Sequence, residues 1–204
     1  LGIAAPPDEV IASLLRCAGP DTDLSNRQAA VAECNADYRA WSTLPKGRGD
    51  LAMSEVMSQI EGALAKDVIV TNGAGNYTVW VHRFHRHRRY VTQLAPISGS
   101  MGYGLPAAVA AARVMPDRQV VCFAGDGCFL MHGQELATAV QYNVNLTVIV
   151  VNNGMYGTIR MHQERHYPGR VSTTDLVNPD FAALAQSYGC HGETVNKTDQ
   201  FAGA

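Results

Sequence analysis

The stretch VVCFAGDGCFLM, from Val120 to Met131, decides the fold class of this chain. It opens with five apolar residues in a row and then places an acid, Asp126, between Gly125 and Gly127. An apolar run without alternation is typical of a strand that is covered on both faces, as in a parallel sheet. Because a buried carboxylate is costly unless it is paired, hydrogen-bonded or bound to a metal, we expect a partner for Asp126.

The segments around this strand alternate between helical and extended patterns. Helices are predicted over 53–64, 75–84, 103–115, 133–143, 156–164 and 178–189. Strands are predicted over 67–71, 119–125, 146–153 and 191–195. Apolar strands that are separated by helices indicate an α/β fold, with a doubly wound parallel sheet and helices on both faces. In such sheets ligands bind beyond the carboxyl ends of the strands, where Asp126 lies.

Residues 1–50 are interpreted as a separate helical piece, either a linker or the tail of a preceding domain. This piece holds two predicted helices and ends in TLPKGRGDLAM, whose proline and glycines indicate a linker. Residues 51–204 form the α/β domain. Its last residues, TDQFAGA, resemble the opening of a helix, so we expect a domain that is truncated at its C terminus.

Composition narrows the possible classes of protein. The net charge of -2 argues against nucleic acid or an anionic membrane as the partner of the whole chain. No apolar run approaches the roughly 18 to 20 residues of a membrane span, and we expect a cytoplasmic protein. The five cysteines include no CxxC pair, so neither a disulfide framework nor a zinc site is indicated.

Two polar residues end two consecutive predicted strands. Asp126 closes one strand, and Asn153 closes the next one 27 residues later. If the strands are neighbours, about 4.8 Å apart, the two side chains can converge on one point. A carboxylate, an amide oxygen and a backbone carbonyl suit magnesium or calcium rather than zinc. The alternative is a plain strand-to-helix turn in which Asp126 caps the helix.

The segment GDGCFLMHGQELATAVQYNVNLTVIVVNNGMYG, residues 125–157, resembles the thiamine-diphosphate motif that begins GDG and ends NN. This motif occurs in the group of acetolactate synthase, pyruvate decarboxylase and benzoylformate decarboxylase. The preceding SGSMGYGLPAAVAAARVMPDRQVV is similar to the segment that this family places just before GDG. The resemblance runs from about residue 66 to the C terminus, roughly two-thirds of the chain.

The resemblance implies two cofactors, thiamine diphosphate and Mg²⁺, and a set of residues that hold them. The implied magnesium ligands are the side chains of Asp126 and Asn153 and the backbone carbonyl of Met155. The implied cofactor-binding residues are Asn76, Tyr77, Gly99, Ser100, Met101, Gly125, Asp126, Gly127, Cys128, Asn153, Met155, Tyr156, Gly157 and Thr158. Among them, the backbone N–H groups of Gly127 and Cys128 and the start of the helix at 156–158 would face the diphosphate.

Two of these residues are implied to be catalytic. Met101 matches the bulky residue that bends the cofactor into a V shape, and Gly99 matches the residue whose carbonyl accepts from the 4'-amino group. On this resemblance the cofactor carries out the chemistry, which is loss of carbon dioxide from a 2-oxo acid followed by protonation or ligation of the product. Taken without its neighbours, Met101 is better read as a core residue at a helix start, whereas within GSMGYGLPAA the cofactor role is favoured.

The family activates the cofactor with a glutamate on a separate pyrimidine-binding domain, usually of the opposite subunit. Residues 1–50 are too short for that domain, so we expect a domain or subunit that supplies the glutamate, a homodimer or homotetramer, and no turnover by this chain alone. Glu135 is interpreted as a residue of a helix's first turn, stabilised by the helix dipole, rather than as a substitute.

Two histidine-rich regions remain open. His162 stands where acetolactate synthases have a tryptophan, so His162 and His166 are read either as substrate-facing or as surface residues. The basic cluster, residues 82–90 (HRFHRHRRY), is read as a solvated or subunit-facing surface, with a metal site or nucleic-acid site as less favoured options.

The leading hypothesis is therefore the diphosphate- and Mg-binding part of a thiamine-diphosphate enzyme, acetolactate-synthase-like, that acts on a 2-oxo acid. The alternative is a non-catalytic nucleotide or metal-phosphate binding module. A dinucleotide site is disfavoured, because no GxGxxG follows a predicted strand.

Overall fold

The chain forms two compact units in the computed structural model, Leu1–Ser42 and Thr43–Ala204. The structure describes residue 2, residues 4–17 and residues 25–204. The first unit contains the two helices predicted there, α1 (Pro7–Cys17) and α2 (Ser25–Trp41), and neither has a buried residue. The assignment of residues 1–50 to a preceding domain stays a prediction.

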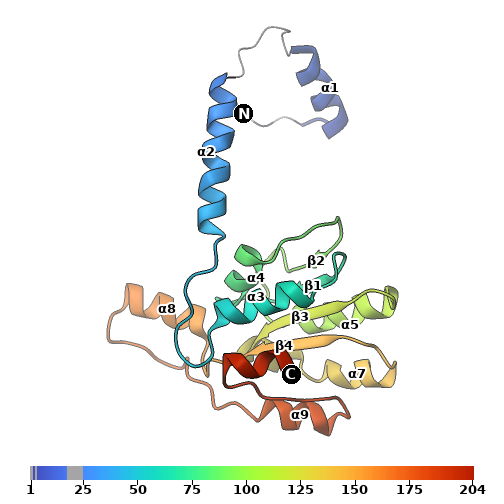
Figure 1. The fold of residues 1–204 in the computed structure, drawn as a ribbon, viewed down its shortest axis with the longest axis vertical. Helices are drawn as coiled ribbons and strands as arrows, with labels where there is room; N and C mark the ends of the chain where they lie inside the picture. The colour runs from blue at the N-terminus through green and yellow to red at the C-terminus, as the bar shows by residue number, and fades with distance from the viewer. Residues whose placement is uncertain (1, 3, 18–24) are drawn as a thin grey trace. The chain divides into compact units, whose positions relative to one another are not determined.

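The second unit is built on a sheet of four parallel strands (Figure 1). The strands are β1 (Ile69–Asn72), β2 (Gln93–Leu94), β3 (Val120–Gly125) and β4 (Thr147–Val151), in the order β2-β1-β3-β4. In the centre, Cys122 pairs with Thr71 on one side and with Val148 on the other. The predicted parallel α/β fold is confirmed.

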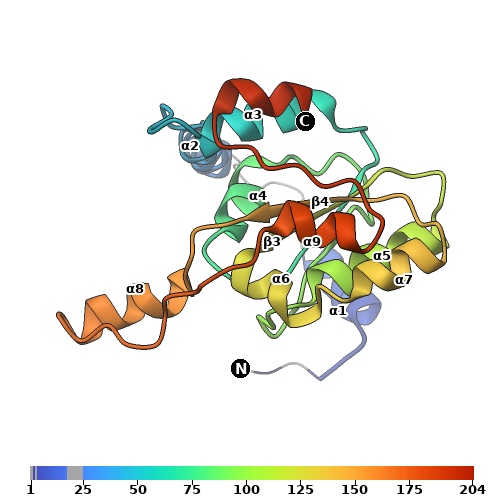
Figure 2. The same ribbon diagram turned by 90° about the horizontal axis from the view of Figure 1, so that it is seen from below.

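Helices cover both faces of this sheet. One face is packed by α5 (Gly104–Val114), α6 (Asp126–His132), α7 (Glu135–Gln141) and α9 (Phe181–Ser187). The other is packed by α3 (Met53–Ala63), α4 (Thr78–Phe84) and the 3-10 helix η1 (Thr198–Gly203). Figure 2 shows α3 and η1 above the sheet and α5 and α7 below it. The apolar β3 is therefore buried on both sides.

A further helix, α8 (Gly157–His166), follows β4 and projects away from the sheet in both views (Figures 1 and 2). It contains no buried residue. Its first residues lie at the carboxyl end of the sheet, and the rest of the helix extends outward. Among the described residues, no helix combines the length and the apolar character needed to cross a membrane.

The predicted strand over 191–195 is wrong. These residues have no regular structure, and Gly192 lies so close to Ala182 of α9 that a Cβ at position 192 would collide with the Ala182 carbonyl. The Gly192 carbonyl also accepts a hydrogen bond from Gln186 Nε2 at 2.9 Å. The segment therefore packs along α9 instead of adding a strand beside β4.

The region after β3 also differs from the predicted pattern. In place of one helix over 133–143, α6 begins directly at Asp126 and α7 follows from Glu135. Gly133 separates the two helices and lies against the Phe129 ring, which a Cβ would meet at 2.9 Å. The short helix α6 was not predicted from the sequence, because its apolar residues continue the apolar run of β3.

Candidate functional site

Asp126 is the central residue of the candidate site, which lies at the carboxyl ends of β3 and β4. Its carboxylate is buried, with 3% of the residue exposed, and it accepts three hydrogen bonds. The donors are the N–H groups of Gly127 at 2.9 Å and Gly154 at 2.8 Å and the Asn178 amide at 2.7 Å. The helix cap that begins α6 is Gly125, not Asp126, so a simple capping turn does not describe this carboxylate.

Asn178 is the residue of this site that sequence reasoning missed. Its Nδ2 donates both to Asp126 Oδ2 at 2.7 Å and to Asn152 Oδ1 at 2.8 Å, which joins the ends of the two strands. Its own Oδ1 is buried and has no partner within the described residues. A buried amide oxygen without a donor is uncommon, and this one is free to accept a hydrogen bond from a ligand. Only the NPDF sequence at a helix start signalled this residue.

The loop after β4 brings the second predicted metal ligand to the same edge. Asn153 is exposed, and its Oδ1 accepts from the Met155 N–H at 3.2 Å. Met155 forms an isolated antiparallel bridge with Asp175, which fixes this loop against the segment that leads to Asn178. The hydrogen bond from Gly154 to Asp126 then places the loop beside β3.

These oxygens fit a hard divalent cation. Asp126, Asn153 and Met155 all follow the carboxyl ends of β3 and β4, and a carboxylate, an amide oxygen and a backbone carbonyl are ligand types that suit magnesium. Among the described residues, no group of three or more His, Cys, Asp or Glu side chains is arranged to hold a metal. The individual ligand roles stay predictions.

Cys128 joins the two glycine-rich turns above the site. Its Sγ accepts from the Gly102 N–H at 3.0 Å and from the Tyr77 hydroxyl at 3.4 Å. The same hydroxyl accepts from the Gly73 N–H at 2.9 Å. The sequence predicted only a backbone role for Cys128, whereas its side chain holds the turn before α4 against the turn before α5.

Burial changes the acidity of the Tyr77 phenol. Removal from water raises its pKa well above the usual range, and the hydrogen bond to the Cys128 thiol raises it further. Tyr77 is therefore a neutral hydrogen-bonding group at any physiological pH. Its role in this structure is to fix the loop that carries Asn76.

Aromatic rings approach the backbone closely at both glycines beside Asp126. A Cβ at Gly125 would meet the Tyr77 ring at 2.8 Å, and a Cβ at Gly127 would meet the Tyr156 ring at 2.5 Å. Separations this short are not compatible with a side chain, so glycine is required at both positions. The two rings enclose the turn that presents Asp126.

Two predicted cofactor-binding residues, Asn76 and Thr158, meet at the start of α8. Thr158 Oγ1 donates to Asn76 Oδ1 at 2.9 Å, linking residues 82 positions apart. Several predicted diphosphate donors already have acceptors within the chain: the N–H of Gly127 bonds Asp126, that of Tyr156 bonds the Thr174 carbonyl, and that of Gly157 bonds the Met155 carbonyl. A bound diphosphate would have to share or replace these hydrogen bonds.

The segment with the two predicted catalytic residues forms a turn before α5. Gly99 has φ of +69°, in the left-handed region that favours glycine, and it is exposed. The hydroxyls of Ser98 and Ser100 on either side are 2.8 Å apart. Met101 is partly exposed, and the next residue, Gly102, is bonded to Cys128. This anchors the turn to α6, whose first residue is Asp126.

The two histidines of α8 lie away from Asp126, on the projecting part of the helix. His162 and His166 are exposed, and their rings are stacked with centroids 6.0 Å apart. With Ile159, Gln163 and Tyr167 they line an open hollow on the helix surface. Exposed histidines that line an open hollow fit both readings, so the substrate-facing and surface alternatives stay open.

The basic cluster, residues 82–90, is only partly helical. Helix α4 ends at Phe84, and the following residues run in extended form towards β2. His82 Nε2 lies 3.2 Å from Asn72 Oδ1, and burial lowers the pKa of His82. His85 is buried and contacts Glu61. The cluster therefore includes structural histidines as well as solvated arginines.

Several known proteins are similar to this chain in sequence. Residues 73–204 match the family described as thiamine pyrophosphate enzyme, C-terminal TPP binding domain. The acetolactate synthase large subunit of Parasynechococcus marenigrum (strain WH8102) is 41% identical over 157 residues, which cover 75% of this chain and 25% of that protein. The acetolactate synthase isozyme 2 large subunit of Escherichia coli (strain K12) is 35% identical over 149 residues, 71% of this chain and 27% of that protein.

A solved structure shows the same fold. The thiamine diphosphate-dependent 4-hydroxybenzoylformate decarboxylase of Rhodococcus jostii RHA1 superposes with a TM-score of 0.73 at 28% sequence identity. The superposition covers 79% of this chain and 31% of that one. The chain spans about a quarter of the length of the two acetolactate synthases it matches.

Proposed function

The chain belongs to the thiamine pyrophosphate enzyme family as a C-terminal TPP-binding domain, and from this membership we propose that it is the diphosphate- and Mg-binding part of an acetolactate-synthase-like enzyme. Such an enzyme decarboxylates a 2-oxo acid and then protonates or ligates the product. The observation that carries the proposal is the buried Asp126 carboxylate, held by donors from three different segments at the carboxyl edge of the sheet.

Each proposed ligand has a structural basis. Asp126 and Asn153 offer side-chain oxygens at the ends of neighbouring strands, and Met155 offers its carbonyl in the loop between them and α8. Asn76 and Thr158 are already hydrogen-bonded to each other at the start of α8. Thiamine diphosphate, when bound, supplies the nucleophilic carbon with which a 2-oxo acid loses carbon dioxide.

The protein's own contribution is to bind and orient. The side chain of Asn178 holds Asp126 Oδ2, so that the carboxylate keeps one orientation towards a metal ion. The Cys128 thiol fixes the turn that carries Gly99 and Met101, the two residues proposed to shape and accept from the pyrimidine side of the cofactor. Positioning of this kind lowers the entropy that a bound cofactor must lose before reaction.

The proposal includes a partner. Glu135 is the first residue of α7, and its carboxylate accepts a hydrogen bond from Thr138 Oγ1 at 2.8 Å. This carboxylate therefore interacts within its own helix. The activating glutamate is then supplied by a pyrimidine-binding domain, of the same protein or of a second subunit, in a homodimer or homotetramer. The 204-residue chain alone is expected to have no turnover on pyruvate.

Ligand-dependent heat protection tests the proposal against the alternative of a nucleotide-binding module. A ligand that binds only the folded state adds about 2.7 kcal/mol to the free energy of unfolding at a hundredfold excess over its Kd, and so raises the melting temperature. We expect thiamine diphosphate with Mg²⁺ to protect the chain and ADP with Mg²⁺ to leave it unchanged. The Asp126→Asn variant should lose the protection, whereas Asp117→Asn, an exposed aspartate in a turn, should keep it. Protection by ADP alone would overturn the proposal.

A further inference from the structure

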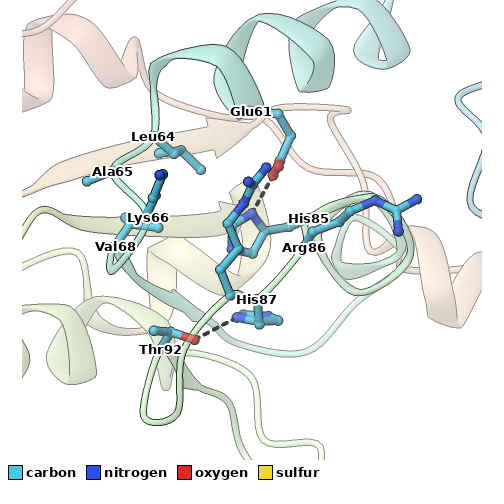
Figure 3. Close-up of a pocket in the computed structure, with 10 residues that line it drawn as sticks. Glu61, Leu64, Ala65, Lys66, Val68, His85, Arg86, His87 and Thr92 are labelled. Atoms are coloured by element: carbon cyan, nitrogen blue, oxygen red, sulfur yellow. Dashed lines mark hydrogen bonds and ion pairs between the residues drawn. The ribbon is translucent and has the colours of Figure 1, made fainter.

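A second cavity lies at the opposite edge of the sheet from Asp126. It has a volume of about 180 Å³, and its lining includes Lys66 and Val68, just before β1, and Thr92, just before β2. Because the strands are parallel, residues that precede them lie at the amino edge, away from the carboxyl edge that carries the candidate site. Figure 3 shows this cavity and its lining.

His85 is the buried polar residue of this cavity. Its side chain is 5% exposed, and its Nδ1 is paired with Glu61 Oε1. Its other nitrogen, Nε2, is buried and has no hydrogen-bond partner in the described part of the chain. Nδ1 is occupied by Glu61, so Nε2 is the ring atom left to meet a ligand. A buried polar atom without a hydrogen-bond partner is costly, so His85 Nε2 calls for a partner that the described residues do not supply.

His87 holds the His85 ring in place. The two rings meet edge to face with centroids 4.5 Å apart. The Thr92 hydroxyl donates its one proton to the Arg89 carbonyl at 2.8 Å and therefore accepts from His87 Nδ1 at 3.1 Å. Burial lowers the pKa of His87, and the neighbouring His85 lowers it further. His87 is thus a neutral, fixed neighbour that orients His85.

The free charges at the cavity are cationic. Lys66 and Arg88 line it, and within the described residues neither has a hydrogen-bond or ion-pair partner. The one lining carboxylate, Glu61, is already paired with His85. In Figure 3, Lys66 lies across from His85, while the guanidinium of Arg86 points away from the other labelled residues. The local charge therefore attracts an anion.

The size of the cavity limits what it can hold. Pockets for whole cofactors or drug-sized ligands measure about 300–1,000 Å³, whereas a water molecule takes up about 30 Å³. A volume of about 180 Å³ accommodates a small tetrahedral anion with some water, but not a nucleotide. Three polar groups of the lining match a ligand with several oxygens: Lys66 Nζ before β1, and His85 Nε2 and the Arg88 guanidinium in the stretch after α4.

We propose that this cavity is an anion site for a phosphate group, separate from the site for thiamine diphosphate. The buried His85 Nε2 forms a hydrogen bond with one phosphate oxygen, and Lys66 and Arg88 neutralise the charge from the rim. The phosphate is either the free ion or the head of a phosphorylated metabolite whose carbon skeleton extends into solvent. No covalent step is involved.

NMR titration of the 204-residue chain with inorganic phosphate tests this site, with the histidine ring nitrogens observed and ionic strength kept constant with chloride. We expect saturable shifts of the His85 and His87 ring signals. The double variant Lys66→Gln/Arg88→Gln should raise the Kd for phosphate about tenfold or more, since it removes two positive charges beside the anion. The matched control Lys46→Gln/Arg48→Gln removes the same charge at exposed positions and should leave the Kd unchanged.

Further measurements distinguish free phosphate from a phosphorylated metabolite, and this cavity from the site at Asp126. Tighter binding of glycerol 3-phosphate than of inorganic phosphate would identify a phosphorylated metabolite, and equal binding would identify the free ion. Asp126→Asn should leave the His85 shifts intact, so that failure of the proposed function is distinguishable from failure of this site. Shifts that do not saturate, that chloride reproduces, or that the control double variant weakens equally would overturn the proposal.

Discussion

Neighbouring strands β3 and β4 are similar in sequence but differ in burial. All six residues of β3 are buried, whereas none of the five residues of β4 is. The same difference continues into the residues that end them: Asp126 is 3% exposed and held by three donors, while Asn152 and Asn153 are exposed. One strand is therefore followed by an oxygen that is held in place, and the other by oxygens that are freer to move.

This contrast bears on how a metal ion would be held. A carboxylate whose hydrogen bonds are already in place has little freedom left to lose when a cation binds, so it acts as the anchor. An exposed amide can turn towards the ion after it arrives. The unequal burial of the strands thus predicts unequal consequences for changes at their ends.

The largest expected effect comes from Asp126→Asn, which removes the charge but keeps the shape. The affinity for thiamine diphosphate with Mg²⁺ should fall by more than about a hundredfold, or about 2.8 kcal/mol, because a neutral amide attracts the cation far less in a buried position. Asn153→Ala, at the exposed strand end, should cost about tenfold. Calorimetric titration measures both losses, and equal losses would remove the distinction between a fixed and an adjustable ligand.

Loss of the residue that orients Asp126 should have the next largest effect. Asn178→Ala removes the donor to Asp126 Oδ2 and is expected to lower magnesium-dependent affinity about 10- to 100-fold, as is typical when a partner of a metal ligand is removed. Asn145→Ala, at an exposed loop position, is the matched control. If the two variants bind alike in the same titration, Asp126 does not depend on Asn178.

Valine substitutions compare the two strands directly. Val120 in β3 and Val150 in β4 pack in the same core cluster, and both lose two methyl groups in a change to alanine. We expect Val120→Ala to lower the free energy of unfolding by about 2 kcal/mol and Val150→Ala by about 1 kcal/mol, because only Val120 is fully buried. Urea denaturation checks this, and a larger loss at Val150 would contradict the burial difference.

The smallest effect at neutral pH is expected at Cys122, in the middle of β3. Burial raises the pKa of this thiol from 9.0 to about 12. The unfolded chain therefore releases the thiol proton at a pH where the folded chain still holds it, so Cys122 makes stability fall as the pH rises from about 9 to about 12.

Cys122→Ala should accordingly flatten the decline of the melting temperature with pH in this window. Cys34→Ala, at an exposed position, is the control and should keep the original slope. A Cys122→Ala variant with an unchanged slope would show that the thiol is not shielded as deeply as the structure indicates.

Much of the fold could be predicted because it depends on local patterns. The apolar runs that became β1, β3 and β4 and the helical spacing between them are properties of short windows of sequence. The predicted strand over 191–195 failed because its pattern was weak and the packing of Gly192 on α9 decided its path. The spacing of Asp126 and Asn153 located the candidate site for the same local reason, since each lies within two residues of the end of an apolar strand.

By itself, the sequence determined the parallel sheet, the edge at which polar residues gather and the family to which the chain belongs. Only the tertiary structure decided that Asn178, 52 residues away, holds Asp126, that the Cys128 thiol joins two turns, and that His85 is buried beside Glu61. The physical reason is that strand and helix periodicity arise from contacts between near neighbours. Hydrogen bonds between distant segments depend on how the whole chain is arranged in three dimensions, and no short sequence pattern encodes that arrangement.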